Sequence, residues 1–219
     1  MRAFLSRVRR IPLSVVIAAS ALPFAGGCFL PPAANVQDAR MVGQGNVRAA
    51  GFWSGLNGTE EDEKAADEFG ALLGVGLGEK SELQLRVERI DLADEDDGYQ
   101  FMSLGPKFGL VEDQLALLVP FGFYFGEDIE MADTFQIQPA ILGTIPVSQA
   151  FEVNASGRVA LPFDSDLFTW AIFGFGVGFS PDLDRWAILP EISYSIALDE
   201  EDADSYFGYG LALTIRTGD

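Results

Sequence analysis

The residues best suited to chemistry in this sequence are carboxylates in two dense runs, Asp94-Glu95-Asp96-Asp97 and Asp199-Glu200-Glu201-Asp202. Close-packed carboxylates attract hard divalent cations such as Ca²⁺ and Mg²⁺. The spacing of a calcium-binding loop, Asp-x-Asp-x-Asp-Gly, is not present, because Gly98 stands where a third ligand is needed. We therefore expect these runs to bind Ca²⁺ or Mg²⁺ diffusely and predict no specific metal site.

Most catalytic arrangements are excluded by composition. The 219-residue chain contains no histidine and one cysteine. Without an imidazole there is no Ser-His or Cys-His catalysis and no histidine-ligated metal. One cysteine also excludes an internal disulfide and a thiolate zinc cluster. An Asp/Glu pair could still perform acid–base chemistry, but the acids gather in runs typical of solvated loops. We predict a protein that is not an enzyme, with no catalytic residues and no cofactor.

The chain is both strongly acidic and strongly apolar. It has 33 acidic and 14 basic residues, a formal net charge of −19, and 48% hydrophobic residues. Such a negative chain repels nucleic acid, so no nucleic-acid partner is expected. Its apolar content excludes global disorder. The elements of the fold must therefore separate the apolar residues from the acids.

The N-terminus has the pattern of an export signal. Four arginines between Arg2 and Arg10 precede an apolar stretch, Ile11–Phe24, that is too short to span a bilayer. The following Ala25-Gly26-Gly27-Cys28 resembles the lipobox of bacterial lipoproteins, in which the signal is removed and the cysteine carries a diacylglyceryl group. The resemblance implies a signal peptide over 1–27 and a lipid on Cys28. Leu is usual at the position of Ala25, so ordinary signal cleavage nearby is the alternative.

Residues 28–44 contain Pro31-Pro32 and few large apolar residues, which predicts an extended, lipidated tether. From residue 45 to 219 the dominant spacing of the apolar residues is two, the period of a β-strand. The predicted strands lie near 45–55, 69–78, 81–91, 99–110, 114–126, 134–145, 149–161, 167–179, 184–198 and 205–216.

Most of these strands are 10 to 13 residues long. Strands of globular domains average about 5 to 6 residues, whereas a tilted membrane-spanning strand needs about 9 to 11. The sequence thus predicts an all-β fold, an antiparallel up-and-down transmembrane β-barrel of about ten strands, with eight as an alternative. Residues 59–73 also fit a helical face behind a capping threonine.

The connections between the predicted strands alternate between short and long. The five long connections hold 22 of the 33 acids, so one end of the barrel is intensely negative. Short periplasmic turns and longer outer loops are the pattern of outer-membrane barrels. An even number of strands places the N-terminus and the C-terminus on one side, which this pattern makes the periplasmic side.

The second face of the strands is small and polar, with scattered charges. This composition suits a barrel lumen, where small residues fit and opposite charges can pair. The alternative is a soluble lipocalin-like barrel, with the apolar face turned inward around a small molecule. The charges predicted to face the lumen are Arg48, Arg86, Glu88, Lys107, Glu152, Arg158, Glu191 and Arg216.

Residues 44–219 resemble the small outer-membrane β-barrel proteins of Gram-negative bacteria, in pattern and in the opening Val42-Gly43-Gln44-Gly45-Asn46. The resemblance implies an outer-membrane location, with lipid, lipopolysaccharide and the barrel assembly machinery as partners. Its members often end on an aromatic residue, whereas this chain ends Ile215-Arg216-Thr217-Gly218-Asp219. We expect a structural or surface-interaction barrel. A narrow channel for small solutes and a soluble small-molecule binder are the alternatives.

Overall fold

A computed structural model describes residues 29–59, 63–93, 98–127, 129–165, 167–199 and 205–217. The predicted signal peptide, Cys28, Asp94–Asp97 and residues 200–204 lie outside this part of the chain. Among the described residues, no helix is long and apolar enough to cross a membrane.

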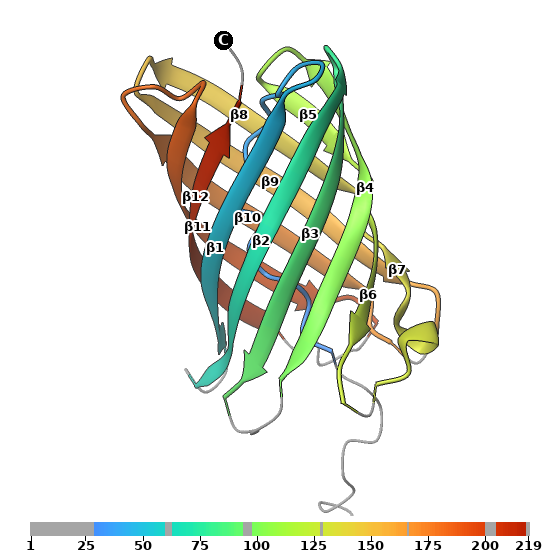
Figure 1. The fold of residues 1–219 in the computed structure, drawn as a ribbon. Helices are drawn as coiled ribbons and strands as arrows, with labels where there is room; N and C mark the ends of the chain where they lie inside the picture. Colours follow the sequence, from blue (N-terminus) through green and yellow to red (C-terminus); the bar gives the residue numbers. More distant parts are fainter. Residues whose placement is uncertain are drawn as a thin grey trace, which may run out of the picture.

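The described residues form one antiparallel sheet that closes into a barrel (Figure 1). Its strands follow chain order around the wall, and β1 closes the barrel by pairing with β12. The elements are β1 (Val47–Gly58), β2 (Lys64–Gly78), β3 (Ser81–Leu92), β4 (Tyr99–Val111), β5 (Leu115–Leu118), β6 (Phe121–Phe125), η1 (Met131–Thr134), β7 (Gln136–Ile137), β8 (Ala140–Ser148), β9 (Phe151–Pro162), β10 (Trp170–Phe179), β11 (Trp186–Ala197) and β12 (Ser205–Arg216).

Two positions in the wall are each occupied by a broken strand. β5 and β6 both pair with β4, and β7 and β8 both pair with β9. The breaks fall at Pro120 and Pro139, which lack the N–H that a sheet ladder needs. The wall therefore has ten strand positions, and the prediction of an up-and-down antiparallel barrel of about ten strands is confirmed.

Two local expectations are wrong. The helical alternative for 59–73 fails because Lys64–Leu73 belong to β2, where they pair with β1 on one side and β3 on the other. The predicted turn at 146–148 also fails, since those residues continue β8 and the chain turns at Gln149 and Ala150. In both places ladder pairing with neighbouring strands overrides the local pattern.

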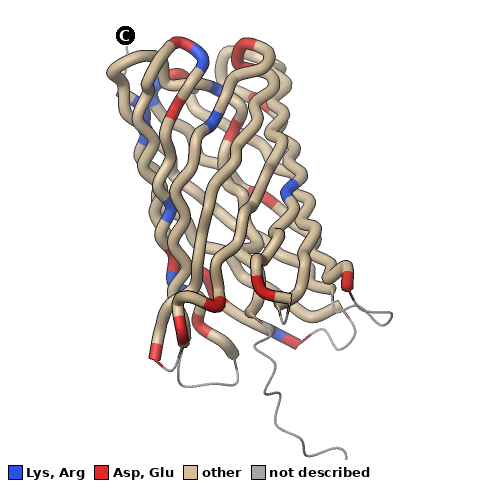
Figure 2. Tube along the Cα trace, turned by 90° about the vertical axis from the view of Figure 1, so that its right-hand side faces the viewer, with Lys and Arg blue, Asp and Glu red and all other residues tan. Residues whose placement is uncertain are grey.

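The barrel is apolar outside and polar inside. On β2, Phe69 and Leu77 point outward and are 50% and 58% exposed, whereas Glu68 faces the lumen and is fully buried. Phe108, Phe151 and Phe179 are also exposed, toward the short-turn end. This distribution is the reverse of a lipocalin-like barrel, whose apolar face lines the interior. In Figure 2 many of the described acids lie at the two rims of the barrel, and others lie along the strands.

The segment before β1 lies inside the barrel. Residues Leu30–Ala39 are buried in the lumen, and the N-terminal trace in Figure 1 passes through the interior. Phe29 packs at the long-loop end, beside Tyr99 and Tyr124, whereas Thr217 pairs with Val47 at the short-turn end. The sequence predicted an extended tether over 28–44 and both chain ends on one side. Among the described residues, Leu30–Ala39 are instead buried in the lumen, and Phe29 and Thr217 lie at opposite ends of the barrel. We call residues 29–40 the luminal segment.

Candidate functional site: a lumen filled by the N-terminal segment

The luminal segment is suited to a narrow interior by its composition. Pro31-Pro32 keep the backbone extended, and Ala33, Ala34 and Ala39 occupy little volume. In the described part of the chain, the hydrogen bonds that join this segment to the wall all involve side chains of the wall. The segment is therefore bound to the sheet without being one of its strands.

Aromatic side chains hold the segment at the long-loop end. The Tyr99 hydroxyl accepts a hydrogen bond from the Leu30 N–H at 2.7 Å, and the Tyr124 hydroxyl donates to the Leu30 carbonyl at 3.2 Å. The Phe29 ring stacks on Tyr124, with centroids 4.8 Å apart and an interplanar angle of 7°. Backbone and side chain of the entering segment are thus both fixed at this rim.

Two buried glutamates hold the middle of the segment by its main chain. Glu68 accepts hydrogen bonds from the Ala33 N–H at 3.0 Å and from the Ser54 hydroxyl at 2.5 Å. Glu191 accepts from the N–H groups of Asn35 at 2.6 Å and Val36 at 2.9 Å. These bonds give both carboxylates the partners that burial demands.

Val36 has a strained backbone. Its φ angle is +40°, in the left-handed region that a β-branched residue rarely adopts. Such a conformation persists only where the surroundings over-determine it. The two adjacent hydrogen bonds to Glu191 provide that constraint.

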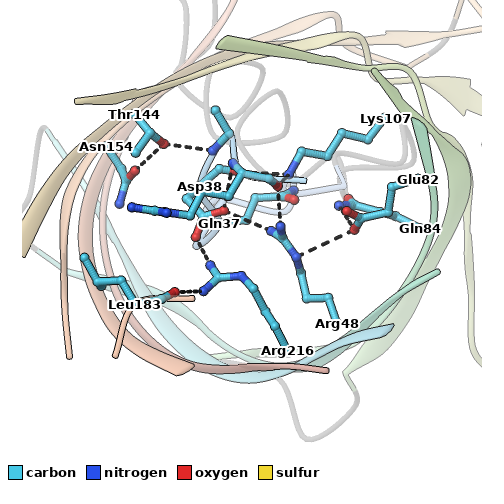
Figure 3. Close-up of polar contacts among 12 residues, drawn as sticks. Gln37, Asp38, Arg48, Glu82, Gln84, Lys107, Thr144, Asn154, Leu183 and Arg216 are labelled. Atoms are coloured by element: carbon cyan, nitrogen blue, oxygen red, sulfur yellow. Dashed lines mark hydrogen bonds and ion pairs between the residues drawn. The ribbon is translucent and has the colours of Figure 1, made fainter. Parts of the chain in front are cut away.

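Asp38 is the centre of a charged cluster toward the short-turn end (Figure 3). Its carboxylate forms ion pairs with Arg48, at 3.2 Å between Oδ1 and Nη1, and with Arg216. The Lys107 ammonium donates to the main-chain carbonyls of Asp38 and Arg40, at 2.9 Å each. Three cations of the wall, from β1, β4 and β12, therefore contact residues 38–40 of the segment.

Arg40 and Ala39 extend this network to the opposite wall. Arg40 Nε lies 2.9 Å from Glu152 Oε2, and Arg40 Nη1 lies 3.0 Å from the exposed Asp184. The Ala39 N–H donates to the Thr144 hydroxyl at 2.8 Å, which in turn donates to Asn154 at 2.7 Å (Figure 3). The cluster thus binds the segment to β8 and β9 as well.

A glycine turn joins the luminal segment to β1. Gly43 and Gly45 have φ angles of +75° and +79°, which glycine adopts without strain. Backbone hydrogen bonds from Gly45 N to Gly76 O and from Gly76 N to Asn46 O, at 3.0 and 2.9 Å, fix the turn against β2. The chain reverses here, so the segment and β1 run in opposite directions.

The eight charges predicted to face the lumen are all buried there: Arg48, Arg86, Glu88, Lys107, Glu152, Arg158, Glu191 and Arg216. Seven of them fall into three groups. Arg48, Lys107, Arg216 and, through Arg40, Glu152 belong to the Asp38 cluster, Arg86 and Glu88 form a pair at 2.6 Å, and Glu191 binds the segment. The Nε and Nη2 atoms of Arg158 have no hydrogen-bond partner among the described residues.

Sequence reasoning missed two glutamates and the luminal segment. Glu68 falls in the acidic connection between the predicted strands 45–55 and 69–78, yet it lies in β2, two positions before Gly70 on the lumen face. Glu82 begins the alternating run that continues with Gln84, Arg86 and Glu88. The two-residue spacing of that run was therefore a sufficient signal to predict that Glu82 faces the lumen. The eight predicted charges comprise five basic and three acidic residues. With both glutamates included, the wall presents five acidic and five basic buried residues, so the basic excess of the predicted set disappears.

Little space remains between the segment and the wall at mid-height. A cavity lined by residues that include Arg86, Arg158, Gln37 and Gln138 has a volume of about 20 Å³. That volume holds about one water molecule. This cavity is therefore too small to admit a solute larger than water.

The acidic runs proposed for divalent cations are mostly outside the described residues. Asp199 is described, and its carboxylate accepts a hydrogen bond from the Thr169 N–H at 2.5 Å. Within the described ranges, no group of three or more potential ligands is placed to hold a metal ion. Diffuse cation binding at these runs remains a prediction.

No known protein family matches this chain, and no match was found among curated proteins. The chain is similar to solved β-barrels. The N-terminal β-barrel domain of Pseudomonas aeruginosa OprF is 16% identical, over 79% of this chain and 99% of that chain, with a TM-score of 0.33.

Ail, the attachment invasion locus protein of Yersinia pestis, is 14% identical over 80% of this chain and 99% of its own, with a TM-score of 0.35. The outer membrane protease OmpT from Escherichia coli is 10% identical over 78% and 95%, with a TM-score of 0.39. The likeness to these three proteins is one of fold alone.

Proposed function

We propose that this protein is a non-enzymatic outer-membrane β-barrel lipoprotein with a structural or surface-interaction role, whose lumen is closed by its own N-terminal segment. The observation that carries the proposal is the inverted distribution of side chains. Charges are buried in the lumen, while large apolar side chains such as Leu77, Ile145 and Phe173 are 58%, 66% and 56% exposed.

Water does not favour such a surface. Soluble monomers rarely expose contiguous apolar patches larger than a few hundred Å². Here the exposed apolar residues extend over all long strands of the wall, and a bilayer would cover them. A closed barrel also satisfies every strand edge, as lipid requires. The exposed apolar wall and the closed sheet favour a membrane barrel over a soluble small-molecule binder.

Aromatic side chains near the strand ends support a membrane position. Trp53 and Tyr209 contact each other in a T-shaped arrangement on the outer wall, with ring centroids 5.5 Å apart. Phe151 and Phe179 are paired across β9 and β10 toward the opposite end. Two aromatic belts are expected where a barrel wall meets the two bilayer interfaces.

We assign the short-turn end to the periplasm and the long acidic loops to the cell surface, following the usual loop asymmetry of outer-membrane barrels. Lipid would contact the apolar wall, and lipopolysaccharide would contact the wall and its rim at the long-loop end. Divalent cations at the acidic loops would reduce repulsion from lipopolysaccharide phosphates. Assembly by the barrel assembly machinery and lipidation of Cys28 belong to the same proposal.

The filled lumen favours a structural or surface role over a channel. Leu30–Ala39 are buried inside the wall, and the mid-height cavity of about 20 Å³ admits about one water. We expect purified full-length protein in planar bilayers to show no discrete current steps. Regular steps from wild-type protein would restore the channel as the better proposal.

Membrane extraction and gel mobility test the central claim. The protein should stay with the membrane fraction after carbonate washing, and the folded barrel should migrate faster unboiled than boiled. The boiled half of each sample is the matched control for mobility. Release of the protein by carbonate, together with unchanged mobility, would contradict the proposal. Mass spectrometry of the mature N-terminus tests the lipid on Cys28.

A further inference from the structure

The luminal segment crosses the whole barrel. It contacts Tyr99 and Tyr124 at the long-loop end. The residues that follow it, 41–45, contact Gly76 and Gly109 at the short-turn end, where β1 begins. Thr217, at the end of the wall, is also at the short-turn end. Phe29 and Thr217 therefore lie at opposite ends of the molecule.

The lumen recognises this segment mainly through its main chain. Wall side chains accept hydrogen bonds from the N–H groups of Leu30, Ala33, Asn35, Val36 and Ala39. Other wall side chains donate to the carbonyls of Leu30, Asp38 and Arg40. The side chains of the segment that form ion pairs with the wall are those of Asp38 and Arg40.

Such an arrangement is a binding site for an extended polypeptide. The acceptors Glu68, Glu191 and Thr144 are spaced along the lumen so that they meet in turn the N–H groups of Ala33, of Asn35 and of Ala39. Three cations bind oxygen atoms of the segment: Arg48 and Arg216 pair with the Asp38 carboxylate, and Lys107 donates to a main-chain carbonyl. Small side chains at Ala33, Ala34 and Ala39 let the backbone approach the wall.

We propose that the barrel is a conduit for its own N-terminus: the lumen binds residues 29–40 as an extended peptide and delivers the mature N-terminus to the membrane face opposite Thr217. This inference rests on the proposed membrane location. It adds that Phe29 and Thr217 are on different sides of the membrane.

The length of the chain permits this path. Residues 29–46 could span up to about 60 Å when extended, whereas the hydrocarbon core of a bilayer is about 30 Å thick. The segment therefore has enough length to cross the membrane inside the barrel and to form the glycine turn before β1.

A designed disulfide tests whether the segment occupies the lumen in the membrane. A Cβ built on Gly208 lies 3.5 Å from the Ala33 Cβ, within the range of natural disulfides. The Ser193 hydroxyl has to rotate away, which a terminal group can do. The double variant Ala33→Cys/Gly208→Cys should form an intrachain disulfide in isolated membranes, seen as a gel shift that reducing agent removes.

The matched control is Ala33→Cys/Gly51→Cys. A Cβ at Gly51 meets nothing within 4 Å and points outside the barrel, so no disulfide should form. If Gly208→Cys prevents folding, Ala34→Cys/Gly210→Cys is the second pair, with 3.3 Å between the Cβ positions. Heat-modifiable barrels that form neither disulfide would overturn the proposal.

Cysteine labelling tests the side on which each end lies. A membrane-impermeant maleimide applied to intact cells should label Phe29→Cys and Glu130→Cys, the latter at the exposed long-loop rim, but not Thr217→Cys. Permeabilisation should then expose Thr217→Cys. Labelling of Phe29→Cys only together with Thr217→Cys would refute the conduit. Carbonate release of the whole protein would instead refute the membrane location, so the two failures are distinguishable.

Discussion

Arg48 and Arg216 are direct cross-strand partners in the β1–β12 register, and Asp38 forms an ion pair with each of them. Like charges directly opposite each other destabilise a sheet. Here both guanidiniums face the lumen at the one pairing that closes the barrel. Asp38 therefore neutralises a repulsion that closure itself creates.

We expect Asp38→Asn to lower the free energy of unfolding by about 3 kcal/mol, because it leaves buried arginines without their carboxylate. Arg216→Gln should also destabilise the wild type. In the Asp38→Asn background, however, Arg216→Gln should recover about 1 kcal/mol or more, because it removes the repulsion across the seam. Urea unfolding in lipid vesicles gives the unfolding free energy of the wild type, the two single variants and the double variant, which together form a double-mutant cycle.

The control for this cycle is Asp184→Asn. Asp184 also pairs with an arginine, Arg40, but its side chain is 85% exposed, and we expect a change within about 0.5 kcal/mol. Strict additivity of Asp38→Asn and Arg216→Gln would show that the seam does not depend on Asp38.

Glu191→Gln should loosen the middle of the luminal segment. The substitution removes a charge-assisted acceptor for two adjacent N–H groups, so hydrogen-exchange protection of Asn35 and Val36 should fall by about tenfold. Release of the strained Val36 backbone acts in the same direction. Glu112→Gln, at an exposed turn, should change neither amide. Unchanged protection in Glu191→Gln would mean that other contacts hold this part of the segment.

Gly76→Ala should destabilise the barrel by about 2 kcal/mol. A Cβ at this position would lie 1.7 Å from the Gly43 carbonyl oxygen, so the turn before β1 would have to move. Gly51→Ala is the matched control, because its Cβ enters open space. We expect it to be neutral or stabilising by up to about 1 kcal/mol. Equal unfolding midpoints for the two variants would contradict the close approach.

Leu73→Lys tests the outer wall. Leu73 lies in the middle of β2 and is 45% exposed on the outer face. In a bilayer, a lysine at this depth should lower the unfolding free energy by about 2–4 kcal/mol. Glu112→Lys, at the rim, should have little effect. An unchanged unfolding free energy for Leu73→Lys in vesicles would indicate that this face does not contact lipid.

The wall was predictable from the sequence because lumen and exterior impose opposite chemistry on alternate residues. That contrast marks Phe69, Leu73 and Leu77 as outward, and it also places Arg86 and Glu88 inside. In the sequence, the only sign of the strand breaks is the presence of Pro120 and Pro139, which cannot donate a hydrogen bond to a sheet ladder.

The path of the luminal segment was not predictable in the same way. Residues 29–40 have no period, and their small side chains suit an exposed tether as well as a narrow interior. Their partners are distant in sequence: Leu30 contacts Tyr99 69 positions later, and Asp38 contacts Arg216 178 positions later. A local pattern carries no information about such contacts, so Asp38 and Arg40 were missed.

The contact between Asp38 and Arg216 also sets an order of events during biogenesis. Asp38 leaves the ribosome early, but its partner on the last strand is synthesised 178 residues later. Contacts of such large sequence separation form late. A barrel sealed first would then have to admit the segment through a narrow, charged opening. The simpler order is that the wall curls around the segment and that β1 and β12 pair last. The N-terminal residues must then stay in the open wall until that pairing forms.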